Sequence, residues 1–121
     1  MAEELKPPYL KKIDVRGPLV IWAVDGNYIR THLDEEFTNF GQHYRYKYIP
    51  EHEFWIDLGT KSDEWKFFIE HLLVEYRLMK DGLPYQQAIV QADTEERKER
   101  RRAGDLSRET NHGQKLPDGK D

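Results

Sequence analysis

The stretch from Trp65 to Lys80 constrains the fold more than any other part of the chain. It contains neither glycine nor proline, and its apolar residues recur with helical spacing. At about 100° per residue, one sector gathers most of the large apolar side chains. They are Trp65, Phe68, Ile69, Leu72, Tyr76 and Met79. With Ser62 as the cap and Asp63 in the first turn, the pattern predicts a helix from Ser62 to about Lys80.

Two polar residues of this helix, His71 and Glu75, lie one turn apart at the edge of the apolar sector. They fall in the gap between that sector and a second apolar group. The second group is Phe67, Val74 and Leu78. A carboxylate in this position needs a partner, because an unpaired buried charge is very costly.

A second helix is predicted from about Pro84 to Arg102. Gly82 suits the end of the first helix, and Pro84 suits the first turn of the next. A connection this short makes the two helices antiparallel neighbours. The second helix has an apolar stripe of Tyr85, Ala88, Ile89 and Ala92. Glu96 continues this stripe, which places it within reach of His71.

The side chains of His71, Glu75 and Glu96 therefore form a candidate site. An imidazole and two carboxylates are suitable ligands for zinc or another divalent transition metal. Two other arrangements remain open. A protonated His71 can pair with both carboxylates without a metal, or the three groups can face water. By residue type alone a metal-free hydrogen-bonded network is favoured, and a metal site at His71, Glu75 and Glu96 is its alternative.

The chain before the helices predicts a sheet. The β-branched and aromatic run Leu19–Val24 and the run Glu53–Asp57 are typical of strands. Asp25-Gly26 predicts a hairpin with residues 27–33 as its return strand. Residues 43–49 alternate tyrosine with basic residues, which predicts a further strand. The fold class is α+β, with an antiparallel three- to four-stranded sheet packed on an antiparallel helix pair.

Composition divides the 121 residues into three parts. Residues 1–18 are expected to form an extended arm, residues 19–102 a single α+β domain, and residues 103–121 a disordered polar tail. The chain has no cysteine, which excludes disulfides and thiolate metal sites and favours a cytoplasmic location. The longest apolar run, Leu19–Val24, is too short to cross a membrane.

A resemblance to known proteins rests on single residues spread over residues 45–97. They are Ile49, Pro50, Trp55, Ile56, Asp57, His71, Glu75, Met79, Gly82, Tyr85 and Ala88. This order resembles a group of small uncharacterised bacterial and phage-type proteins with a minimal zincin-like layout. In that layout, strands precede a helix with a His-Glu-x-x-Glu or His-Glu-x-x-His motif, and a second helix carries a further ligand, in the small proteins an Ala-His pair. The resemblance implies a metal site on the helix pair.

This chain departs from that layout at two positions. Leu72 stands where the layout has a glutamate, which is the general base of zinc hydrolases. Ile89 stands where it has the histidine of the Ala-His pair. Two alternatives follow: Glu96 replaces that ligand, or Glu75 has a structural role. The resemblance therefore implies a degenerate site that is not an active protease. Whether the protein is an enzyme of another kind is not decided by these residues.

Two surfaces are candidates for partners. Arg97, Lys98 and residues 100–102 form a basic helix end that, with the C-terminal tail, could contact an unknown protein partner. The tyrosines of residues 43–49 could stack on single-stranded nucleic acid. The formal net charge of −4 argues against a general nucleic-acid binder. The alternative functions are thus a non-enzymatic protein-interaction or regulatory module, and a weak single-stranded nucleic-acid binder.

Overall fold

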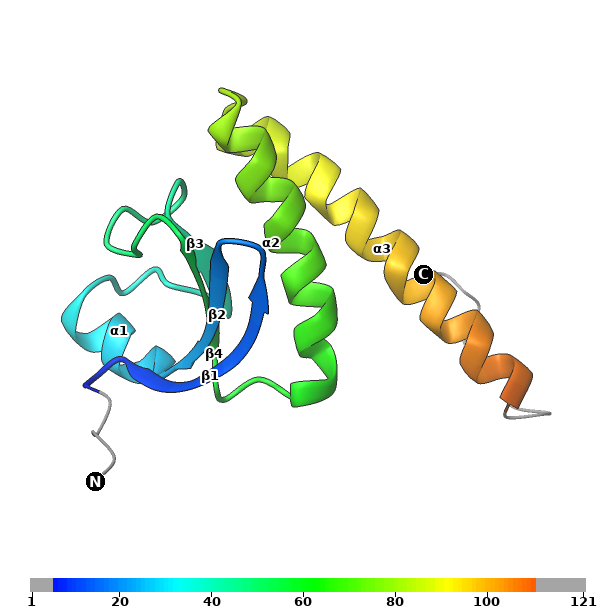
Figure 1. The fold of residues 1–121 in the computed structure, drawn as a ribbon, viewed down its shortest axis with the longest axis horizontal. Helices are drawn as coiled ribbons and strands as arrows, with labels where there is room; N and C mark the ends of the chain where they lie inside the picture. Colours follow the sequence, from blue (N-terminus) through cyan, green and yellow to red (C-terminus); the bar gives the residue numbers. More distant parts are fainter. Residues whose placement is uncertain (1–5, 111–121) are drawn as a thin grey trace.

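The computed structural model describes residues 6–110, with side chains as far as residue 104. A four-stranded sheet, ordered β1-β2-β4-β3, packs against α2, and α3 lies on the outer side of α2 (Figure 1). The elements are β1 (Tyr9–Arg16), β2 (Leu19–Val24), α1 (Gly26–His32), β3 (Phe40–Gln42), β4 (Glu53–Asp57), η1 (Ser62–Glu64), α2 (Trp65–Lys80) and α3 (Tyr85–Thr110). The α+β class is confirmed. The sheet, however, is mixed and not purely antiparallel, because β2 runs parallel to β4.

The Asp25-Gly26 pair starts a helix instead of a hairpin. The Asp25 carboxylate accepts a hydrogen bond from the backbone N–H of Tyr28 at 3.0 Å and so caps α1. The predicted return strand over residues 27–33 is therefore wrong. The chain crosses over through α1, which allows β4 to run parallel to β2. The hairpin occurs earlier, at Gly17-Pro18, where Gly17 has a φ of 59°.

The two faces of the sheet are covered by different parts of the chain. Alternate residues of β2 and β4 pack under α2: Leu19, Ile21, Phe54 and Ile56 contact Phe68, Ile69, Leu72 and Tyr76. The opposite face is covered by α1 and the segments on either side of β3. Its buried side chains are Val24, Ile29, Phe37, Tyr46, Ile49 and Trp55. The buried α2 residues that were predicted for the core therefore all pack on one face of the sheet.

The predicted strand over residues 43–49 is wrong. These residues form turns, in which the N–H of Tyr46 donates to the carbonyl of Gln42 at 2.9 Å and that of Ile49 to the carbonyl of Tyr46 at 3.0 Å. Tyr46 and Ile49 are nevertheless buried. The alternating pattern thus reports burial and not strand pairing. The tyrosine strand proposed as a stacking surface for nucleic acid does not form.

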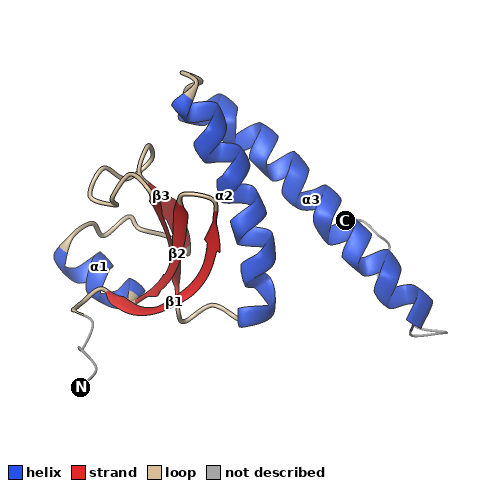
Figure 2. Cartoon of the chain, in the orientation of Figure 1, coloured by secondary structure: helices blue, strands red, loops and turns tan. Residues whose placement is uncertain are grey.

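The first long helix, and the start of the second, lie close to the predicted positions. Ser62 is not the cap: it opens the 3-10 turn η1, where no side chain makes a capping hydrogen bond. Gly82 ends the first helix with a φ of 105°, as predicted. The second helix continues past Arg102 to Thr110, which corrects its predicted end and the expected start of the tail (Figure 2). Residues 111–121 lie outside the described part of the chain.

No helix within residues 6–110 has the length and apolar character needed to cross a membrane.

Candidate metal centre between two helices

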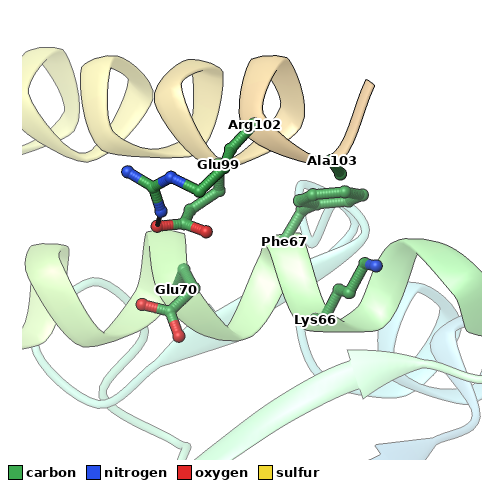
Figure 3. A pocket seen from close by; sticks show the side chains of 6 residues that line it. All are labelled: Lys66, Phe67, Glu70, Glu99, Arg102 and Ala103. Atoms are coloured by element: carbon green, nitrogen blue, oxygen red, sulfur yellow. Dashed lines mark hydrogen bonds and ion pairs between the residues drawn. The ribbon is translucent and has the colours of Figure 1, made fainter. Parts of the chain in front are cut away.

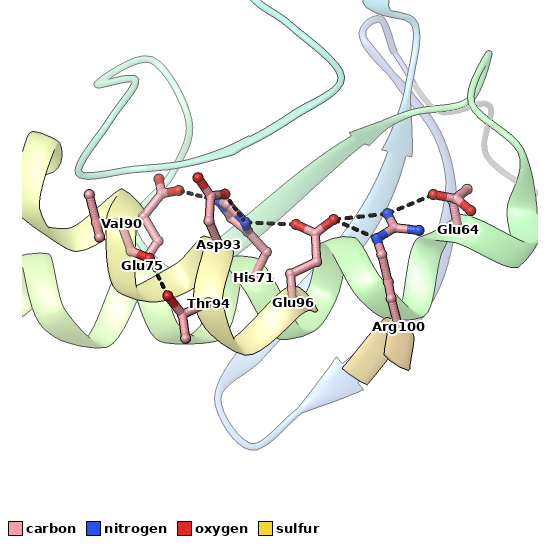
Figure 4. Close-up of polar contacts among 8 residues, drawn as sticks. All are labelled: Glu64, His71, Glu75, Val90, Asp93, Thr94, Glu96 and Arg100. Carbon is pink, nitrogen blue, oxygen red and sulfur yellow. Dashed lines mark hydrogen bonds and ion pairs between the residues drawn. The ribbon is translucent and has the colours of Figure 1, made fainter. Parts of the chain in front are cut away.

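His71 projects from α2 into the contact with α3, and carboxylates surround its ring (Figure 4). Its Nε2 lies 3.2 Å from Glu75 Oε1 on the same helix. Its Nδ1 lies 2.9 Å from Glu96 Oε1 and 3.4 Å from Asp93 Oδ1, both on α3. His71 and Glu75 are each only 3% exposed. The structure thus brings together the side chains of His71, Glu75 and Glu96, and it adds Asp93.

The edge of the sheet fixes the α2 side of this cluster. Gln42, the last residue of β3, is fully buried, and its Nε2 donates to Glu75 Oε2 at 2.6 Å. The Gln42 side-chain oxygen accepts a hydrogen bond from the N–H of Tyr44 at 2.8 Å. The ring of Phe40 meets the His71 ring edge-on, with 5.0 Å between their centroids. The positions of both Glu75 and His71 are therefore set by contacts with β3.

An arginine holds the α3 side of the cluster. Arg100 Nε donates a hydrogen bond to Glu96 Oε2 at 2.9 Å, and Arg100 Nη2 forms an ion pair with the same oxygen at 2.8 Å. The same Nη2 donates to Glu64 Oε1 at 2.7 Å, and the guanidinium lies 4.4 Å from the centre of the Phe67 ring. Together with His71 and Glu75, these groups form a row of alternating charges along the helix pair (Figure 4).

The carboxylates determine the charge of His71. Burial lowers the pKa of His71, but the hydrogen bonds with Glu75 and Glu96 outweigh it and raise the pKa to about 9. The hydrogen bond from His71, joined by Arg100, holds the pKa of Glu96 below its usual value against the opposing effect of burial. An ionised carboxylate only accepts hydrogen bonds. In the metal-free protein both ring nitrogens of His71 therefore carry a proton at neutral pH.

His71, Asp93 and Glu96 could hold a metal ion. One ligand atom from each of these residues lies within 4.8 Å of the other two. The side chain of Asp93 is 47% exposed, so the centre is open to water on that side. Glu75 faces the other ring nitrogen and lies outside this group of three. Such a carboxylate orients a histidine whose opposite nitrogen binds a metal.

Comparison of the chain with protein-family models, with curated proteins and with solved structures gives no match.

Sequence reasoning missed two members of the cluster. Asp93 lies beside the apolar stripe of α3 and not on it, although its spacing of three residues from Glu96 places both on neighbouring turns. That spacing is the signal that could have found it. Gln42 belongs to β3, a strand of three residues that was not predicted because it is too short to show a repeating pattern.

The basic helix end is largely paired within the chain. Lys98 forms an ion pair with Glu95, and Arg102 forms one with Glu99. Arg100 is engaged by the cluster described above. A partner that binds this end remains a prediction.

Proposed function

We propose that this chain is a small metal-binding domain that holds one divalent transition metal ion between α2 and α3. His71 Nδ1 and the carboxylates of Asp93 and Glu96 are the protein ligands. The observation that carries the proposal is the meeting of these three ligand atoms within 4.8 Å. In this state His71 Nε2 keeps its proton and donates a hydrogen bond to Glu75 Oε1, while Gln42 donates one to Glu75 Oε2.

The donor set favours zinc or a metal of similar preference. One imidazole nitrogen and two carboxylate oxygens suit zinc, and also cobalt, iron and manganese in the divalent state. Soft ions that prefer thiolates are disfavoured, since the chain has no cysteine. Three protein ligands with one open side leave a further position for water.

We do not propose protease activity for this centre. In zincin-like helices the general base follows the first histidine directly. Here that position is Leu72, which is fully buried in the core under α2. We propose that the chain has a degenerate zincin-like layout, which binds a metal ion but does not hydrolyse peptide bonds.

Zinc titration into chelator-treated protein tests the proposal. Calorimetry is expected to show one zinc ion per chain. Asp93→Asn, which changes a half-exposed side chain and should leave the fold intact, is expected to weaken binding by more than about tenfold through loss of a ligand. Glu75→Gln is expected to weaken it by about 10–100-fold, the usual effect of losing a carboxylate that orients a ligating histidine.

Glu95→Gln is the matched control. Its side chain is 46% exposed on α3, close to the 47% of Asp93, and it pairs with Lys98 instead of His71. The variant removes the same charge from the same helix, so general electrostatics would weaken both variants equally. Absence of zinc binding by the natural chain, or equal affinities of Asp93→Asn and Glu95→Gln, would refute the proposal.

A further inference from the structure

We propose that the metal ion controls the docking of α3 on the domain: with the ion bound, α3 is clamped to α2, and without it α3 detaches more readily than the rest of the fold opens. This inference rests on the proposed metal site and concerns what binding does there. It follows from where the ligands come from. His71 belongs to α2, whereas Asp93 and Glu96 both belong to α3.

Few apolar contacts hold α3 in place. Within the described residues it packs on α2 and has no comparable contact with any strand. As far as residue 104, its fully buried apolar side chains are Ala88 and Ala92, each with a single methyl group to bury. By contrast, α2 buries four larger side chains against the sheet, namely Phe68, Ile69, Leu72 and Tyr76. Apolar burial therefore stabilises α2 far more than α3.

Beyond the cluster the two helices diverge (Figure 1). A groove of about 290 Å³ separates them there, as Figure 3 shows. It is lined by Lys66, Phe67, Glu70, Glu99, Arg102 and Ala103. Four of these six are charged, and among the described residues no hydrogen bond or ion pair joins the two helices across the groove. The polar cluster around His71 is consequently the last firm attachment of α3 before its outer half leaves the domain.

A bound ion strengthens that attachment because its ligands come from both helices. When α3 is undocked, two of the three ligands are removed from His71, and the chelate cannot form. An ion that binds only the docked state stabilises it by mass action. At a zinc concentration about 100 times the Kd, the ratio of docked to undocked molecules rises about a hundredfold.

Amide hydrogen exchange can detect this change residue by residue. A helix in a protein owes most of its stability to tertiary packing, so the amides of α3 exchange when it detaches. Zinc at about 100 times the Kd is expected to slow exchange of α3 amides 94–104 by up to about a hundredfold. Amides of β2 and β4 serve as the internal control and are expected to change much less. In Asp93→Asn at the same zinc concentration, the slowing of the α3 amides should be smaller by the factor by which the variant's zinc affinity falls.

Bound zinc is measured in the same samples, which separates two failures. If zinc binds but α3 amides do not slow, or if β2 and β4 slow to the same degree, the clamp is refuted and the metal site stands. If the natural chain binds no zinc, the proposed function fails and the clamp fails with it.

Discussion

Replacement of His71 by alanine is expected to lower the free energy of unfolding of the metal-free domain by about 3–5 kcal/mol. Glu75 would remain 3% exposed, still held by Gln42, but without the cation beside it. It must then stay ionised in a poorly solvated position or take up a proton, and either choice is costly. Urea denaturation at neutral pH with a chelator present measures the loss.

A double variant separates the lost charge pair from the lost volume. His71→Leu fills most of the space but leaves Glu75 unpaired, so it should be nearly as unstable as His71→Ala. His71→Leu combined with Glu75→Leu removes both charges and is expected to recover much of the loss. Recovery is incomplete because the amide of Gln42 loses its carboxylate acceptor. A single-variant loss below about 1 kcal/mol, or a double variant no better than His71→Leu, contradicts a charged His71–Glu75 pair.

Most of what could be predicted from the sequence came from helical periodicity. The 3.6-residue repeat located α2 and α3, placed His71 and Glu75 at the edge of the core, and aligned Glu96 with His71. These deductions succeed because neighbours along a helix and across a short helix connection are fixed by local geometry. The strands β2 and β4 were also predictable, because both contain a short run of β-branched and aromatic residues that is largely buried.

The failures arose where one residue pattern serves two structures. Asp25-Gly26 suits both a hairpin turn and the start of a helix, and the hydrogen bond from Tyr28 that decides for the helix is not visible in the pattern. Residues 43–49 alternate because successive side chains point into and out of the domain, which turns can also achieve. Gln42 joins the site through the pairing of β3 with β4, a contact between distant segments.

The stability of the metal-free protein is expected to fall as the pH rises from about 6.5 to 9. His71 has a folded-state pKa of about 9 in place of its ordinary 6.5, so the folded protein holds its proton more tightly than the unfolded chain does. The stabilisation is complete below 6.5 and is lost as the pH rises through 9. At about 1.36 kcal/mol per pH unit, it amounts to at most about 3 kcal/mol, since water near Asp93 screens part of it.

The acidic side of the profile has the opposite cause. The lowered pKa of Glu96 contributes stability above its ordinary value of 4.5, and this is lost as the pH falls below that value. Urea denaturation in chelator should therefore give maximal stability between about 4.5 and 6.5, the ordinary values of these two groups. His71→Gln cannot carry the charge and is expected to flatten the decline between 6.5 and 9. If stability declines equally in that variant, the titrating group is not His71. The protonated His71 would then not be the charge that joins Glu75 on α2 to Glu96 on α3.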